Sequence, residues 1–192
     1  MASRLGRRLG AWTVLQTYSR LVIDCNRAPD HPGLIAEESD GARPPANQDL
    51  TPHERARRLD EIYAPYHAAI REELDRRAAS GQPAMLISIH SFTPAMGGLA
   101  RPWHMGVLHD GASAASDAML RLLRREPDLV VGDNEPYAMD GIDYTIPLHA
   151  IARGLPFLEL ETRQDLIADA SGVERFAALL ARVIPQALSG LA

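Results

Sequence analysis

Short apolar runs alternate along the chain with segments of helical period. The apolar runs predict strands at residues 13–15, 21–24, 84–90, 129–132 and 156–161. The run at 84–90 shows no polar alternation, so both of its faces are expected to be covered. This pattern indicates a sheet that is packed between helices.

Helices are predicted at residues 2–9, 51–79, 116–125 and 147–153, and from Ser171 towards the C-terminus. Thr51 is a suitable N-cap and Glu54 completes a capping box, with a proline at the first helical position. Pro65 predicts a kink or a break inside this helix. Ser171 with Glu174 predicts a second capping box.

The alternation of strands and helices predicts one α/β domain that spans residues 1–192. We expect three layers, with a mixed, mostly parallel sheet and helices on both of its faces. Residues 28–50 and 93–114 show no period and are predicted loops. Long loops in compact domains are often functional.

Composition argues against nucleic acid and membranes as partners, and a small-molecule substrate is expected. The 192 residues carry a net charge of −5, so no basic surface is expected for nucleic acid or for an anionic membrane. No apolar run reaches the ~18 residues of a membrane span. The chain has no lysine, which excludes a Schiff-base lysine, and Cys25 is its single cysteine. A reducing cytoplasm is the expected location.

Three predicted strands end in polar residues, in the segments 21–27, 86–92 and 158–165. Ligands of open α/β sheets gather at the carboxyl ends of strands. His90 is then a candidate zinc ligand, Glu161 a candidate base, and Arg27 a fork for a carboxylate. These groups together are suited to metal-assisted hydrolysis of an amide in a carboxylate-bearing substrate.

Each of these residues also has a structural alternative. His90 could be a hydrogen-bonded residue at the edge of the core. Asp24 with Arg27, and Glu161 with Arg163, could be simple ion pairs, which contribute little to stability at a surface. Spacing alone leaves both interpretations open.

Short motifs at the three segments resemble those of zinc-dependent exopeptidases of the carboxypeptidase type. They read DCNR at 24–27, IHSF at 89–92 and ETR at 161–163. Longer blocks, among them SRLVIDCNR, ISIHSFTP, RPWHMGVLH, VGDNEPY and HAIARGLP, are more closely similar to the N-formylglutamate amidohydrolase family. This resemblance extends from about Tyr18 to the C-terminus and implies a phosphorylase/hydrolase-like fold.

The resemblance implies hydrolysis of N-formyl-L-glutamate to glutamate and formate, in histidine degradation, with Zn²⁺ or another divalent metal. It implies His90 as a metal ligand, Glu161 as the catalytic base, and Asn26 and Arg27 as ligands of a substrate carboxylate. Asp24 would orient a ligand histidine. The residues expected to line the substrate pocket are Arg101, His104, Asn134, Tyr137 and Arg163. For His104 the alternative is a structural role in the 93–114 loop.

One part of the family pattern is missing, namely a first strand that ends in a C-E/D-H-A-like segment with further metal ligands. We therefore expect a fold truncated at its N-terminus and an incomplete metal site, because zinc requires three protein ligands in catalytic sites. An exposed strand edge would favour a homodimer. Two alternatives stay open: a carboxypeptidase or deacylase for another substrate, and a non-catalytic carboxylate-binding member. His67 is expected to be solvated and His149 to be structural.

Overall fold

The computed structural model describes residues 1–111 and 113–189. Contacts divide the chain into two compact units. Unit 1 consists of Met1–Thr13, Leu86–Asp140 and Pro156–Ala192. Unit 2 consists of Val14–Met85 and Gly141–Leu155. The prediction of one domain over residues 1–192 stays a prediction, and each unit is described by itself.

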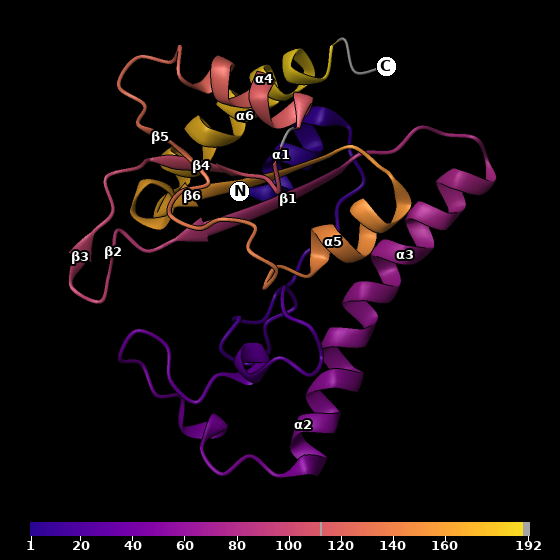
Figure 1. The fold of residues 1–192 in the computed structure, drawn as a ribbon, viewed down its shortest axis with the longest axis vertical. Helices are drawn as coiled ribbons and strands as arrows, with labels where there is room; N and C mark the ends of the chain where they lie inside the picture. The colour runs from indigo at the N-terminus through magenta and orange to yellow at the C-terminus, as the bar shows by residue number, and fades with distance from the viewer. Residues whose placement is uncertain (112, 190–192) are drawn as a thin grey trace. The chain divides into compact units, whose positions relative to one another are not determined.

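Unit 1 is built on a four-stranded sheet of order β1-β6-β4-β5 (Figure 1). Its strands are β1 (Leu86–Phe92), β4 (Met105–Leu108), β5 (Val131–Asp133) and β6 (Phe157–Arg163). Strand β1 is parallel to β6 and β4 is parallel to β5, whereas β4 is antiparallel to β6. The sheet is therefore mixed and mostly parallel, as predicted. A separate antiparallel hairpin pairs β2 (Ala95–Met96) with β3 (Leu99–Ala100).

The helices of unit 1 are α1 (Ala2–Leu9), α4 (Ala114–Leu123) and α6 (Ala170–Leu188), with a short 3-10 turn at Gln164–Ile167. Helix α6 packs against both α1 and α4. Phe176 and Leu180 on α6 are fully buried, as are Leu158 and Leu160 on β6. These side chains form the core of unit 1, because burial of apolar surface is the main favourable term in folding.

Helix α6 begins one residue earlier than predicted and has a different cap. The side chain of Asp169 accepts a hydrogen bond from the backbone N–H of Gly172. The predicted capping box of Ser171 with Glu174 is therefore wrong. The Glu174 carboxylate instead forms ion pairs with Arg4 and Arg8 of α1.

Unit 2 contains α2 (Pro52–Arg58), a π-helical turn (Leu59–Tyr63), α3 (Ala64–Ala79) and α5 (Thr145–His149). Short 3-10 turns occur at Pro32–Ile35, Pro45–Asn47 and Ile151–Arg153. The capping box of Thr51 with Glu54 is confirmed. The predicted kink or break at Pro65 corresponds to the π turn that ends at Tyr63, two residues before it, and helical structure continues through this turn into α3.

The predicted strands at 13–15 and 21–24 are wrong, because both segments are irregular. The apolar segment at 21–24 is buried at Ile23, but its backbone groups bond to partners outside any sheet. The side chain of Asn47 donates to the carbonyl of Leu21, and Arg58 donates to that of Val22. These side chains replace the neighbouring strand that a buried backbone otherwise requires.

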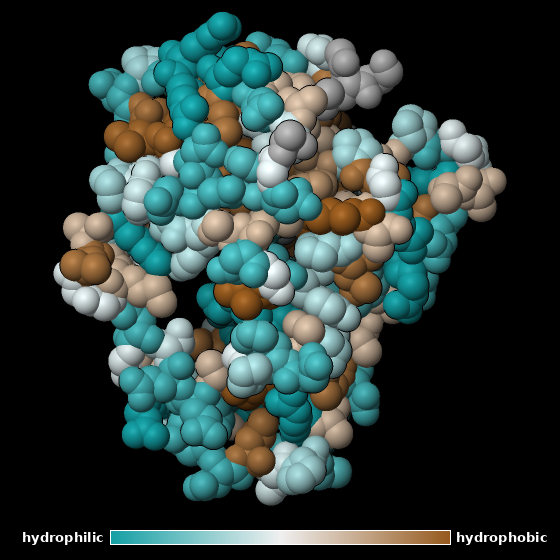
Figure 2. All heavy atoms as spheres, in the orientation of Figure 1, coloured by the Kyte–Doolittle hydropathy of each residue, from teal (hydrophilic) through white to brown (hydrophobic). Residues whose placement is uncertain are grey.

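The α/β fold class is confirmed by the sheet and helices of unit 1. Figure 2 shows a face that is mostly hydrophilic, with scattered apolar side chains. Within residues 1–111 and 113–189, the most exposed large apolar side chain is Leu99 of the β2–β3 hairpin, at 75% exposure. Among the described residues, no helix is long and apolar enough to cross a membrane.

Candidate active site

His90 on β1 and Glu161 on β6 are direct partners in the parallel register of the two strands. Because β1 and β6 run in the same direction, their carboxyl ends lie at the same rim of the sheet. Strand β4 runs the opposite way and begins at this rim, where Met105 pairs with Thr162. Unit 1 therefore brings the predicted ligand and the predicted base together.

Four polar residues share one face of this strand pair. Side chains alternate between faces along a strand, so Ser88 and His90 of β1 lie on the same face as Glu159 and Glu161 of β6. The Nε2 atom of His90 is 2.7 Å from the Ser88 hydroxyl and 3.3 Å from Oε1 of Glu159. Glu159 and Glu161 are only 1% and 6% exposed. Two buried carboxylates beside an imidazole are suited to proton transfer.

Sequence reasoning missed Ser88 and Glu159. The alternation that placed Glu159 and Glu161 on one face was visible in the strand, and the same alternation pairs Ser88 with His90. Only the parallel register of β1 and β6 shows that Glu159 lies beside His90, because it pairs two segments that are about 70 residues apart in the chain.

Two glycines let a loop pass close to the face that carries Glu161. Gly106 of β4 pairs with Glu161 and Gly132 of β5 pairs with Gly106. A Cβ atom at Gly106 or at Gly132 would collide with the backbone carbonyl of Glu135. The absence of both side chains therefore allows the segment around Glu135 to lie against the sheet.

Arg101 and Tyr137 form a second polar group in unit 1. Nη1 of Arg101 donates to the Tyr137 hydroxyl over 2.9 Å and to the Thr93 hydroxyl over 3.3 Å. The guanidinium also lies over the Tyr137 ring, 4.7 Å from its centroid. This stacking fixes the orientation of a cation that is partly exposed.

The three other predicted pocket residues of unit 1 hold the backbone in place. Nη1 of Arg163 donates to three carbonyls in the 101–103 segment, while its other nitrogens bond Asp165. Nδ1 of His104 accepts from the backbone N–H of Val130. Oδ1 of Asn134 accepts from the backbone N–H of His109. The structural alternative for His104 is therefore the one that its contacts support.

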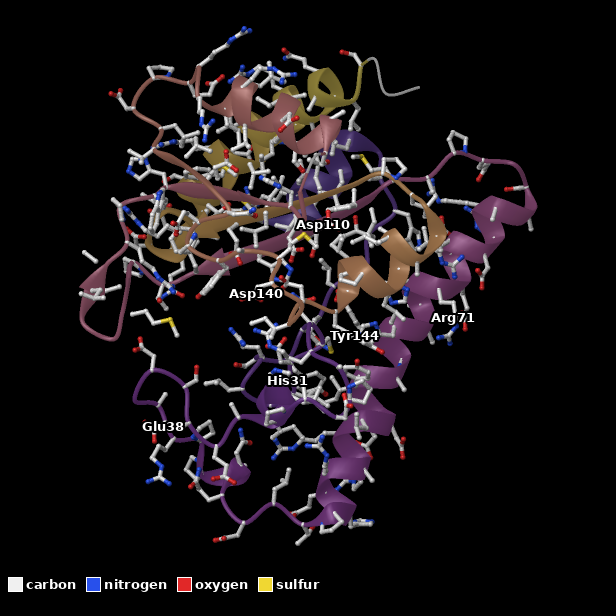
Figure 3. All side chains as sticks on the ribbon, viewed as in Figure 1. His31, Glu38, Arg71, Asp110, Asp140 and Tyr144 are labelled. Carbon is white, nitrogen blue, oxygen red and sulfur yellow. The ribbon has the colours of Figure 1, made fainter. Side chains whose placement is uncertain are left out.

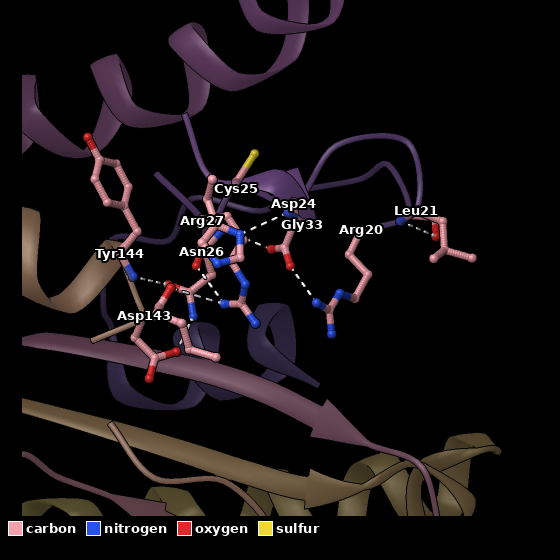
Figure 4. Close-up of polar contacts among 12 residues, drawn as sticks. Arg20, Leu21, Asp24, Cys25, Asn26, Arg27, Gly33, Asp143 and Tyr144 are labelled. Carbon is pink, nitrogen blue, oxygen red and sulfur yellow. Dashed lines mark hydrogen bonds and ion pairs between the residues drawn. The ribbon is translucent and has the colours of Figure 1, made fainter. Parts of the chain in front are cut away.

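In unit 2, Asn26 joins the 24–27 segment to the start of α5 (Figure 4). Its Oδ1 accepts from the backbone N–H groups of Tyr144 and Thr145, and its Nδ2 donates to Asp143. Both ends of the amide are therefore engaged. The Asn26 side chain thus satisfies two backbone N–H groups at the start of α5, whose N-cap residue is Tyr144.

Asp24 and Arg27 flank this amide. Asp24 is 6% exposed, and it accepts from the backbone N–H of Asn26 and from Nη2 of Arg20. Nη1 of Arg27 donates to the carbonyls of Asn26 and Ile142 over 2.8 and 3.3 Å. Within residues 1–111 and 113–189, the Nε and Nη2 groups of Arg27 form no hydrogen bond.

His67 is buried, so the prediction that it is solvated is wrong. Only 4% of this residue is exposed, and Nδ1 of His67 lies 2.8 Å from Nε2 of His149, which is also buried. His149 is therefore structural, as predicted. A sequence signal existed, because His67, Ile70 and Leu74 follow the spacing of one helix face and all three are buried.

The described residues do not fit a complete zinc site. No group of three or more His, Cys, Asp or Glu side chains within residues 1–111 and 113–189 is arranged to hold a metal. His90 with Glu159 beside it does not supply the three protein ligands that catalytic zinc requires. The role of Asp24 in orienting a ligand histidine stays a prediction, and so does a cleft shared by Arg27, His90 and Glu161.

The fold and the residues at the carboxyl ends of β1 and β6 define the class of protein. It is an open α/β protein with an imidazole and carboxylates at the carboxyl ends of parallel strands. The chain belongs to the N-formylglutamate amidohydrolase family, whose model matches residues 1–168. The relation to zinc-dependent exopeptidases stays a prediction.

Two curated relatives are N-formylglutamate deformylases from Pseudomonas species. The Pseudomonas putida protein is 39% identical over 95 residues, which are 44% of this chain and 36% of that protein. The Pseudomonas aeruginosa protein is 38% identical over 93 residues, 43% of this chain and 35% of that protein. The matched part therefore spans about a third of each relative.

Two solved structures are similar to this chain over nearly its whole length. A gene product from Agrobacterium tumefaciens has a TM-score of 0.92 at 37% identity, covering 99% of this chain and 75% of that one. An N-formylglutamate amidohydrolase from Ralstonia eutropha has a TM-score of 0.72 at 21% identity, covering 98% and 82%. The second likeness supports the fold alone.

Proposed function

We propose that the chain is an amidohydrolase that cleaves N-formyl-L-glutamate into glutamate and formate. Family membership and the two deformylase relatives support the reaction. The observation that carries the proposal is the pairing of His90 with the buried Glu161 at one rim of the sheet. The expected setting, histidine degradation in the cytoplasm, forms part of the proposal.

In the proposed reaction, Glu161 removes a proton from the water that attacks the formyl carbon. The water oxygen adds to the formyl carbon and gives a tetrahedral intermediate; the C–N bond then breaks as Glu161 returns the proton to the leaving nitrogen of glutamate. Burial suits Glu161 to this task, because hydrocarbon and backbone around a carboxylate exclude competing water. The described residues do not fit a zinc site, so no step is derived through the expected Zn²⁺.

Substrate binding is assigned to Arg27. The carbonyls of Asn26 and Ile142 hold its Nη1, while its Nε and Nη2 keep the geometry of a fork for a carboxylate. Arg101 is a second candidate, because Tyr137 and Thr93 hold its guanidinium in a partly exposed position.

A second candidate function is a non-catalytic member that binds a carboxylate. The absence of a three-ligand metal group among the described residues favours it. This candidate keeps the role of Arg27 and removes that of Glu161.

A substrate panel tests both functions. We expect formate release from N-formyl-L-glutamate, with no amino acid released from short peptides. Release from peptides instead would indicate a carboxypeptidase, and faster turnover of other N-acyl amino acids would indicate another deacylase. If calorimetry shows that N-formyl-L-glutamate binds but no product is released, the result would indicate the non-catalytic, carboxylate-binding function.

A further inference from the structure

The buried pair of His67 and His149 has a fixed direction of hydrogen bonding. Nε2 of His67 lies 3.0 Å from the backbone carbonyl of Cys25, which can only accept. Nε2 of His67 therefore carries the proton, and in the neutral ring its Nδ1 accepts. The donor to that Nδ1 is then Nε2 of His149. The hydrogen bonds run one way, from His149 through His67 to Cys25.

Both rings are held in the neutral form that this direction requires. The pKa of His67 and of His149 is lowered to about 4, in both cases mainly by burial; at His149 the neighbouring His67 and the cations of Arg153 and Arg71 contribute smaller parts of this lowering. Arg71 lies on α3 (Figure 3). The ring of His67 also lies among the rings of Tyr63, Tyr66 and Tyr144.

The pair connects α5 to the segment that ends in Arg27. The carbonyl of Cys25 accepts from His67 and also from the hydroxyl of Thr145, at the first residue of α5. The Asn26 side chain bonds two backbone N–H groups at the same helix end. His149 is the last residue of α5. Helix α5 is therefore tied to residues 25 and 26 at both of its ends.

The remaining carbonyls of this segment also have their own donors. The carbonyl of Asn26 accepts from Nη1 of Arg27, and that of Arg27 accepts from the hydroxyl of Tyr63. Three consecutive carbonyls are thus bonded to side chains from the π turn, α3, α5 and the segment itself. Such preorganisation reduces the entropy that a ligand must otherwise remove on binding.

We propose that His67 and His149 are positioning residues that hold the 25–27 segment through this chain of hydrogen bonds, which is called the relay below. The relay fixes the Arg27 guanidinium in the orientation that binds a substrate carboxylate. The proposal rests on the proposed function for the identity of the ligand. Neither imidazole touches the substrate in this account. Loss of the relay should therefore weaken binding much more than it slows the chemical step.

The test compares three variants of the full chain by calorimetry with N-formyl-L-glutamate and with L-glutamate. His67→Phe removes the donor and the acceptor, whereas His67→Gln keeps an N–H near the position of Nε2. Ile70→Val is the matched control, because Ile70 is buried on the same helix without contacting the 25–27 segment through a hydrogen bond. We expect Kd to rise at least tenfold in His67→Phe, to recover largely in His67→Gln, and to change less than twofold in Ile70→Val.

A wild-type Kd in folded His67→Phe would overturn the relay. If this variant does not fold, His67→Gln is compared with His67→Asn, whose amide is too short to reach the position of Nε2. Equal Kd values in these two variants would overturn the relay in the same way.

Failure of the proposed function gives a different result. In that case the wild-type chain binds neither ligand, or Arg27→Ala binds both as tightly as the wild type. The relay is then judged by hydrogen exchange at the amides of Tyr144 and Thr145, which bond Asn26. We expect exchange at least tenfold faster in His67→Phe than in Ile70→Val at matched stability, with His67→Gln close to Ile70→Val; equal exchange in His67→Phe and Ile70→Val would contradict the relay.

Discussion

The Cα atoms of His90 on β1 and Glu161 on β6 lie opposite one another in a parallel strand pair. This register places an imidazole and a buried acid on one face at the carboxyl rim of the sheet. Glu159 lies on the same face, 3.3 Å from Nε2 of His90. The proposed hydrolysis depends on this placement of His90, Glu159 and Glu161.

Gly106 should not tolerate a side chain. A methyl group there would collide with the carbonyl of Glu135, and overpacking typically costs about 1–3 kcal/mol. We expect Gly106→Ala to lower the free energy of urea unfolding by this amount. Ser91→Ala, at an exposed position of β1, is the control and should stay within about 0.5 kcal/mol of the wild type. Equal stabilities would mean that the loop does not lie against β4.

Stability should fall as the pH is lowered from 7 to 5. The pKa of His67 and of His149 is about 4 in the folded protein and near 6.5 when unfolded, so the unfolded state binds more protons in this window. The stabilisation is complete above pH 6.5 and is lost as the pH falls towards 4. One such imidazole loses about 2 kcal/mol by pH 5.

Urea unfolding of the wild type and of His67→Gln at pH 7 and pH 5 measures this loss. The variant has one imidazole fewer in the pair, so its stability should depend less on pH. A wild-type protein that is equally stable at both values would contradict the burial of neutral imidazoles.

The cap of α6 should contribute measurably to stability. The Asp169 carboxylate accepts from the N–H of Gly172, and this bond lowers the pKa of the carboxyl. We expect Asp169→Ala to cost about 1 kcal/mol in thermal unfolding monitored by circular dichroism. Ser171→Ala should cost less, because the Ser171 hydroxyl donates to Asp169 and caps no helical N–H itself. The reverse order would restore Ser171 as the cap.

The predicted homodimer depends on the edge of the sheet. Strand β1 stands at one end of the order β1-β6-β4-β5 within the part of the chain that the structure describes. Open strand edges favour pairing with another chain. Light scattering over a wide concentration range should give the mass of a dimer. A monomer at every concentration would count against the prediction.

The sequence predicted the elements whose signals are local. The apolar runs before His90 and Glu161 form β1 and β6, and the capping box at Thr51 begins α2. The segment at 21–24 has the same apolar character, yet it forms no strand. Its carbonyl partners are Asn47 and Arg58, which lie 26 and 36 residues further along the chain.

The candidate site was predictable only in part, because some of its residues have a local sequence signal and others depend on contacts between distant segments. His90 and Glu161 follow from strand ends, whereas Ser88 and Glu159 require the register of two distant strands. Substrate binding by Asn26 and Arg163 stays a prediction, and the structure adds that their side chains bond the backbone of other segments. Such contacts depend on how loops fold back, which residue type alone does not indicate.

The most direct test of the proposed chemistry is the exchange of Glu161 for Gln. The amide keeps the size of the side chain and removes its capacity to take a proton, which typically contributes 10²–10⁴-fold to the rate. Glu126→Gln is the matched control, because Glu126 bonds Arg182 near the surface of the same unit. We expect formate release from N-formyl-L-glutamate to fall at least about 100-fold in Glu161→Gln, in line with that range, with Kd nearly unchanged. Turnover equal to that of the wild type and of Glu126→Gln would remove Glu161 from the reaction.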